Sequence, residues 1–311
     1  MAAALALCTA AGSVRAATLL EATGGGWVSP DEGNFRFQMD VTRQTLPGGA
    51  QSASGQHQMT VANPISGTAA YASISGSSFA DYGVLKARVD GLAMVMPQGA
   101  NIPNITDGTP MAKGGFSARF MDSVTLFDPT LALGAPVQYT FTVDIHVEAS
   151  GAGHTGPQSA GYDTGSFYLH YYMGSDVERT FLFPNGLYTS VPSYSVSLPV
   201  TVSGLNGDVL VLGGELGVSA EDRAGWYSQG GYLWTYGTVT QTHIDASNTI
   251  RFFLDPVTPN LQLISESGHN YATAAVPEPG TWALLAGGLC VLGWRARRAV
   301  RAEVLSPAAA P

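Results

Sequence analysis

A strict alternation of apolar and polar residues between Val137 and Val147 constrains the fold of this chain more than any other feature. Every second residue of this stretch is large and apolar, whereas the residues between them are polar or charged. Successive side chains of a β-strand point to opposite faces, so the pattern predicts a strand with one buried face and one wet face. The apolar positions are Val137, Tyr139, Phe141, Val143, Ile145 and Val147.

The same period of two recurs along the body of the chain, from residue 17 to residue 275. Residues 35–41 and 194–202 repeat it, and Pro199 in the second run indicates an edge strand or a bulge. Turn clusters such as 47–49 and 204–207 separate the runs, and no stretch of the body shows a convincing helical period. We therefore expect an all-β fold, a single antiparallel β-sandwich with a jelly-roll-like strand order. Further strands are expected at 58–62, 68–74, 83–89, 115–127, 166–173, 208–218, 232–244, 249–254 and 260–265.

The composition of the body limits its chemistry and its partners. Both cysteines lie outside the body, Cys8 before it and Cys290 after it, so the body cannot form an internal disulfide. Its stability must therefore come from its core. The body carries 21 acidic and nine basic residues. Because this excess of negative charge repels nucleic acid and anionic polymers at long range, a neutral or cationic partner is expected.

The two ends of the chain have the composition of targeting segments. Residues 1–16 are mostly small and apolar and close with Val14-Arg15-Ala16, which is typical of a signal peptide and its cleavage site. No Lys or Arg precedes the apolar part, so we expect this leader to be truncated at its N-terminus. At the other end, Val276-Pro277-Glu278-Pro279 precedes an apolar run, an arginine cluster and a tail at residues 302–311.

The apolar run from Gly280 to Trp294 predicts a short transmembrane helix. Fifteen residues give a helix of roughly 22 Å, which is shorter than the ~30 Å hydrocarbon core of a bilayer. By the positive-inside rule, the arginines that follow stay in the cytoplasm and the body lies outside it. Pro277 and Pro279 keep the preceding stretch extended, as a processing enzyme requires. Trp282 and Trp294 define the anchor, and the charged cluster that ends it consists of Arg295, Arg297 and Arg298.

Together, residues 276–301 resemble the PEP-CTERM sorting signal of Gram-negative bacteria. The matching elements are Val276, Pro277, Glu278 and Pro279, the apolar helix and the arginine cluster, in the order and spacing of that family. The resemblance implies processing by an exosortase, a membrane enzyme that cuts near the motif in strains that commonly export polysaccharide. It also implies an inner-membrane anchor with a periplasmic body, followed by release or re-anchoring at the outer surface or in the extracellular matrix. It carries no active site.

Motifs of catalysis are mostly missing from the body. Residues 151–156 fit the dinucleotide pattern GxGxxG, but Pro157 follows and no helix is expected there to hold a pyrophosphate. A polysaccharide hydrolase or lyase remains an alternative through Asp144, Glu148 and Asp163. Asp144 and Glu148 are ~13 Å apart along one strand face, too far to act together unless another strand contributes a partner. We assign no catalytic residue, no metal and no cofactor.

Two weaker metal hypotheses also follow from the sequence. Asp144 and His146 project to one side of the predicted strand, where His170 from a second strand would complete a metal site. Asp245, Asn248 and Asp255 are the candidate ligands of a calcium ion in a surface loop.

Aromatic residues give the better binding candidate. Trp226, Tyr227 and Trp234 lie within a short Gly-rich stretch that also contains Tyr232 and Tyr236. Aromatic rings stack on sugar rings because they combine apolar area with a polar handle, so Trp226, Tyr227 and Trp234 are candidates for glycan binding. A strand that lines the core explains the same residues, and the sequence leaves both interpretations open.

These features favour an exported protein of the envelope or exopolysaccharide matrix that is anchored at or released from the surface. It would act by interaction rather than catalysis, with the exosortase, the membrane and exopolysaccharide as its expected partners and nucleic acid not among them. Two alternatives stay open: a polysaccharide-active enzyme, and a structural or adhesin-like subunit that assembles with itself.

Overall fold

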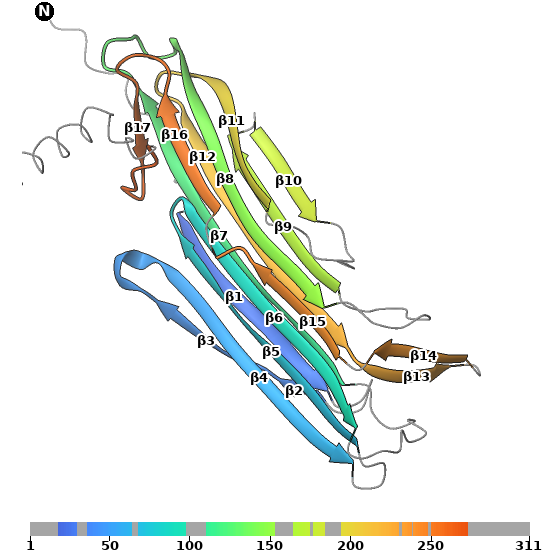
Figure 1. Cartoon of the computed structure of the whole chain (residues 1–311). Helices are drawn as coiled ribbons and strands as arrows, with labels where there is room; N and C mark the ends of the chain where they lie inside the picture. The colour runs from blue at the N-terminus through green and yellow to red at the C-terminus, as the bar shows by residue number, and fades with distance from the viewer. Residues whose placement is uncertain are drawn as a thin grey trace, which may run out of the picture. The chain divides into compact units, whose positions relative to one another are not determined.

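The computed structural model shows an antiparallel all-β body, as expected (Figure 1). It describes residues 18–29, 36–63, 68–97, 110–152, 164–174, 177–183, 194–229, 232–237, 239–247 and 250–272. Within these ranges the one regular element that is not a strand is a 3-10 turn at Pro47–Gly49, where the sequence predicts a turn. No helix in the described part of the chain is long and apolar enough to cross a membrane, and the expected anchor at 280–294 lies outside these ranges.

The strands form a seven-stranded sheet, an eight-stranded sheet and a separate hairpin. The seven-stranded sheet has the order β10-β9-β12-β7-β1-β2, and β17 pairs with the end of β7. Its strands are β1 (Leu19–Ser29), β2 (Phe37–Gln38), β7 (Met111–Phe127), β9 (Thr164–Met173), β10 (Val177–Phe183), β12 (Val209–Arg223) and β17 (Gln262–Ser265).

The eight-stranded sheet has the order β11-β8-β15-β6-β5-β4-β3, and β16 continues the row of β15 between β8 and β6. Its strands are β3 (Asp40–Thr45), β4 (Gln51–Asn63), β5 (Thr68–Asp81), β6 (Val84–Pro97), β8 (Pro136–Ala152), β11 (Tyr194–Leu205), β15 (Val239–Asp245) and β16 (Ile250–Pro256). The hairpin consists of β13 (Gly225–Gln229) and β14 (Tyr232–Gly237).

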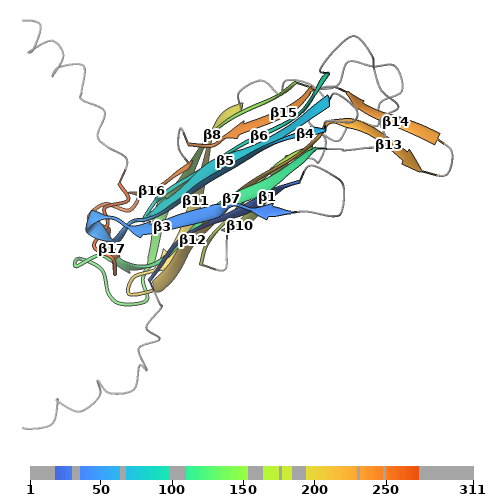
Figure 2. The ribbon, with the colours of Figure 1, turned by 90° about the horizontal axis from the view of Figure 1, so that it is seen from below.

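The two large sheets stack face to face and enclose one core (Figure 2). The alternation in β8 is confirmed, because its six apolar side chains between Val137 and Val147 are at most 3% exposed and the residues between them face solvent. Pro199 is exposed on β11, the strand at one end of the eight-stranded sheet. Because an edge strand has a neighbour on one side only, a residue without a backbone N–H is tolerated there without loss of a hydrogen bond between strands.

Aromatic side chains interlock the two sheets. Phe120 of β7 meets Phe252 of β16 edge to face, with ring centroids 4.8 Å apart. Tyr171 of β9 meets Phe141 of β8 in the same manner at 5.9 Å. Each pair joins one sheet to the other, and such pairs stabilise by about 0.5–1.5 kcal/mol beyond the area they bury.

Phe116 of β7 fills a space that glycines on two other strands leave open. A Cβ on its cross-strand partner Gly24 or on Gly76 of the opposite sheet would lie 2.3 Å from the Phe116 ring. Both positions therefore require glycine for close approach. The run Gly24 to Gly26 also explains why the sequence did not predict β1, because three glycines erase the alternation on which that prediction depends.

We predict that Gly76→Ala destabilises the body by about 1–3 kcal/mol, because the core is overpacked at this position. The new Cβ would lie 2.5 Å from the backbone oxygen of Arg88 as well as against Phe116, so moving one side chain does not relieve the clash. Urea denaturation measures the loss. The matched control is Gly25→Ala, whose Cβ would meet nothing within 4 Å, and equal stability of the two variants would contradict the prediction.

Candidate functional site

The outer face of the eight-stranded sheet carries regular rows of polar side chains. Across strands β3 to β6 one row contains Asp40, Gln56, Ser75 and Asp90, which are successive cross-strand partners. The neighbouring row contains Thr42, Ser54, Ser77 and Arg88 in the same way. Both rows result from the period of two in each strand combined with the register between strands.

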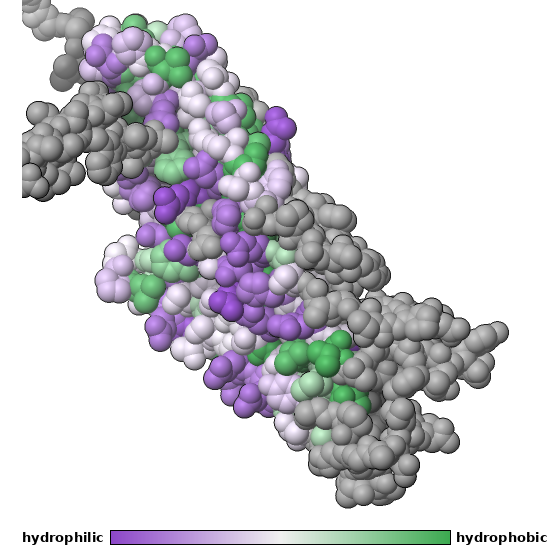
Figure 3. Space-filling view, in the orientation of Figure 1, coloured by the Kyte–Doolittle hydropathy of each residue, from purple (hydrophilic) through white to green (hydrophobic). Residues whose placement is uncertain are grey.

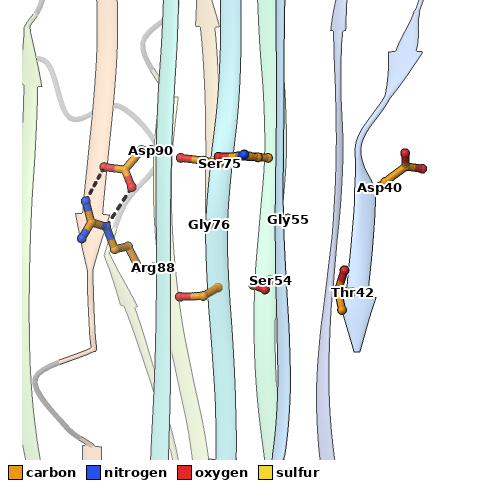
Figure 4. Close-up of a pocket in the computed structure, with 10 residues that line it drawn as sticks. Asp40, Thr42, Ser54, Gly55, Ser75, Gly76, Arg88 and Asp90 are labelled. Atoms are coloured by element: carbon orange, nitrogen blue, oxygen red, sulfur yellow. Dashed lines mark hydrogen bonds and ion pairs between the residues drawn. The ribbon is translucent and has the colours of Figure 1, made fainter. Parts of the chain in front are cut away.

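A hollow of about 510 Å³ lies between these two rows (Figure 4). Its floor is made of small residues on β4 and β5, where Gly55 and Gly76 are direct cross-strand partners. The longer side chains of Arg88 and Asp90 border it on β6, and Asp40 and Thr42 border it on β3. The hollow therefore exists because small side chains on two adjacent strands are flanked by larger ones.

The hydroxyl and carboxamide groups of this hollow have unused hydrogen-bonding capacity. Among the hydrogen bonds within the described part of the chain, none engages the side chains of Ser54, Gln56, Ser75 or Ser77. A hydroxyl both donates and accepts, and a carboxamide offers two donors and an acceptor. The site can thus bind a ligand that itself presents many hydroxyl groups.

An ion-pair network closes the β6 side of the hollow. The Arg88 guanidinium donates to both oxygens of Asp90 at 2.8 and 3.3 Å, and His243 Nδ1 lies 2.5 Å from Asp90 Oδ1. Partial burial acts to raise the pKa of Asp90, but the hydrogen bonds from Arg88 and His243 outweigh it and lower that pKa. Asp90 is thus ionised and satisfied by its neighbours, which leaves little net charge at this wall.

A pair of carboxylates lies farther along the second row. Glu148 of β8 is the direct cross-strand partner of Asp245 of β15, so their Cβ atoms are about 5 Å apart. Asp245 is also the partner of Arg88, and Glu148 contacts His146 at 3.3 Å. The sequence analysis missed this pair because strands that are distant in the sequence bring the two residues together.

Asp144, the other carboxylate expected on β8, lies in a different hollow of about 400 Å³. Its cross-strand neighbours there are Ser197 and Arg251, neither of which is a carboxylate. Asp163 lies outside the described residues.

Both metal hypotheses are wrong as stated. His170 is on β9 of the seven-stranded sheet, where it contacts Thr180, whereas Asp144 and His146 face outward from the other sheet with the core between. Asp245 pairs with Glu148 of β8, and Asp255 pairs with Thr140 of the same strand. Because these two partners are eight positions apart, roughly 26 Å, one calcium ion cannot bind both Asp245 and Asp255. Asn248 lies outside the described residues, and no cluster of three His, Cys, Asp or Glu forms among the described ones.

The aromatic stretch forms the β13–β14 hairpin, which belongs to neither large sheet (Figure 1). In its register Tyr227 is opposite Trp234, and Trp226 is opposite Thr235. The side chains of this hairpin lie outside what the structure describes, so the glycan-binding role of Trp226, Tyr227 and Trp234 stays a prediction. Their strands do, however, lie outside the stacked sheets that enclose the core.

The body ends at a buried carboxylate that holds its last segment. Asp122 of β7 accepts hydrogen bonds from the hydroxyls of Ser265, Ser267 and Tyr271 at 2.6–2.9 Å. Burial and the nearby Asp122 raise the pKa of Tyr271, so its hydroxyl remains a donor. The Tyr271 carbonyl in turn accepts from the Leu254 N–H at 2.8 Å. These bonds fix the chain shortly before residue 275.

The fold and its C-terminal segment define an exported all-β protein with a C-terminal sorting signal. Residues 275–298 match the family described as the PEP-CTERM protein-sorting motif. The chain therefore carries a PEP-CTERM sorting motif, which supports an exported protein that an exosortase sorts to the surface, as the resemblance implied. The motif residues Val276 to Pro279, Trp282, Trp294, Arg295, Arg297 and Arg298 all fall in this match and lie outside the described residues.

The other comparisons add no activity. No curated protein matches the sequence. One solved structure, Clostridium perfringens delta-toxin, aligns with 8% identity over 72% of this chain and 92% of that chain, with a TM-score of 0.15. A TM-score this low carries no argument about fold or function.

We predict that Asp122→Asn loosens the last segment of the body. The new amide nitrogen would face hydroxyl groups that donate to Asp122 in the wild type. Because hydrogen bonds to a charged acceptor contribute about 1.5–3 kcal/mol each, the free energy of unfolding should fall by at least about 2 kcal/mol. Amide hydrogen exchange should accelerate most at residues 262–272. The matched control is Asp144→Asn on the outer sheet face; unchanged exchange in Asp122→Asn would contradict this role.

Proposed function

We propose that this protein acts in the envelope or exopolysaccharide matrix by binding glycan without transforming it. The sorting motif supports a place at the surface of a cell. The observation that carries the binding role is the polar hollow of the eight-stranded sheet, whose exposed hydroxyl and carboxamide groups match the hydrogen-bonding groups of a sugar.

The aromatic hairpin supports the same role. The ribbon of β13 and β14 is paired with neither large sheet, and its concentration of Trp and Tyr favours an external platform. Aromatic residues with a polar handle suit a ligand that is apolar on its ring faces and polar at its edge. We assign the platform to Trp226, Tyr227 and Trp234, with the processed or anchored C-terminus keeping the body near its matrix.

The test is binding of the full chain, purified in detergent, to exopolysaccharide extracted from its own host. We expect saturable binding that Trp226→Ala and Trp234→Ala each weaken by about three- to tenfold, the value of a stacked ring. Isothermal calorimetry gives the affinity. Trp27→Ala is the matched control, because Trp27 lies on the seven-stranded sheet, where Arg36 Cζ is 4.5 Å from the centroid of its ring. No binding at millimolar sugar would reject the proposal in favour of protein partners or self-assembly.

A polysaccharide hydrolase is a second candidate, favoured by the cross-strand pair Glu148 and Asp245. Retaining glycosidases hold their two carboxyl groups about 5–5.5 Å apart, and the Cβ atoms of a direct cross-strand pair are about 4.5–5.5 Å apart, so both side chains start from neighbouring positions. Hydrolysis would transfer a proton to the leaving sugar oxygen from one carboxyl group while the other attacks the anomeric carbon. Water then releases the sugar from the enzyme.

We predict no turnover, and a reducing-sugar assay on host exopolysaccharide tests this. Release of sugar that disappears in both Glu148→Gln and Asp245→Asn, but persists in Asp144→Asn, would replace the binding proposal by the hydrolase.

A further inference from the structure

The polar hollow does not end at Gln56 and Ser75. A second hollow of about 410 Å³ begins at these residues and continues along β4 and β5 to Gln58, Ser73 and Tyr71. Because the two hollows share Gln56 and Ser75, they form one trench along the strands. We name it the β4–β5 trench, lined by Ser54, Gln56, Gln58, Tyr71, Ser73, Ser75 and Ser77.

The dimensions of the trench fit a chain rather than a single sugar. Ser54 and Gln58 are four residues apart on β4, which is about 13 Å, and both line the hollows. The polar groups repeat every second residue on two adjacent strands, so they present a ladder instead of one converging pocket. A ligand with repeating hydroxyl groups matches such a ladder along its length.

One end of the trench is apolar. Tyr71 is the cross-strand partner of Met94, and Met94 is the partner of Val239, which is 41% exposed. Leu92 follows in the next row beside Ser73. Figure 3 shows hydrophobic residues gathered toward one end of this sheet face, beyond a hydrophilic middle. A ring of Tyr71 beside aliphatic side chains gives a stacking position for a sugar ring.

The charges of the site favour a neutral ligand over a polyanion. Asp40 and Asp90 border the trench, and the Arg88 guanidinium already binds Asp90. The body as a whole carries an excess of negative charge. An acidic polysaccharide would gain little from the β6 wall, where Arg88 is already paired with Asp90, and Asp40 on the β3 side would repel it. A neutral polysaccharide meets no such repulsion.

We propose that the β4–β5 trench binds a linear, uncharged polysaccharide that runs along the strands, with Tyr71 stacking on a sugar ring at the apolar end. This inference rests on the proposed function and names its ligand class and its site. The apolar end lies beside the start of β15, because Val239 is the first residue of that strand and β14 ends at Gly237. A polysaccharide that leaves the trench at this end would continue toward the aromatic hairpin.

The experiment uses neutral oligosaccharides, from disaccharide to octasaccharide, prepared from host exopolysaccharide by partial hydrolysis, and an acidic fraction of equal length. We expect affinity for the full chain to rise with length and then level off once the trench is filled. Tyr71→Ala should weaken binding of the longer neutral fragments about three- to tenfold. Ser75→Arg, which fills the middle of the trench, should weaken it by at least about tenfold.

The controls separate this inference from the proposed function. Ser203→Arg places the same side chain on exposed β11 of the same sheet, and Tyr172→Ala removes a tyrosine from the outer face of the other sheet; neither should change affinity. Thermal unfolding confirms that each variant folds. If Ser75→Arg does not fold, the double variant Gln56→Ala/Gln58→Ala replaces it as the test of the trench. Wild-type binding unchanged by Ser75→Arg, or stronger binding of acidic fragments, overturns the trench and leaves the function standing. No wild-type binding overturns both.

Discussion

The close packing of aromatic rings against bare backbone between the sheets is the interaction on which the rest of this structure depends. Phe116 occupies the space above Gly24 and Gly76, and Phe252 approaches Gly214 so closely that a Cβ there would lie 2.5 Å from its ring. The body has no cysteine and the described part has no α-helix, so this inter-sheet contact must supply the stability that a disulfide or a covering helix gives elsewhere.

A core of this kind leaves only outer faces, edges and loops for function. The two outer faces differ. On the seven-stranded sheet Tyr168 and Tyr172 lie over Gly217 and Gly213, so these rings cover backbone of their own sheet. Burial and the Glu215 carboxylate raise the pKa of Tyr168 to about 12, and its hydroxyl donates to that carboxylate. The eight-stranded sheet instead exposes serine and glutamine side chains over glycine, and its face is open.

The sorting signal and the proposed binding face lie in different parts of the chain and have different roles. The signal at residues 275–298 directs the chain to the surface, and Asp122 binds Ser265, Ser267 and Tyr271 shortly before that signal begins. The role that we propose for the body, binding of a neutral glycan, requires no catalytic group. Its excess of negative charge opposes the approach of anionic polymers at long range, whereas hydrogen bonds from hydroxyl and amide groups do not depend on net charge.

The sequence by itself determined the class of fold, the restriction of Pro199 to an edge strand or a bulge, the turns at 47–49 and 204–207, and the sorting motif. Each of these is local, because a period of two, a proline without a donor or a run of apolar residues acts within a few positions. The sequence did not predict β1, whose glycines serve a ring on another strand. Only the tertiary structure decided that Glu148 meets Asp245, that His170 lies across the core from Asp144, and that serines of β4 and β5 form a trench. Strand register and sheet order set these relations, and both depend on contacts between residues far apart in the chain.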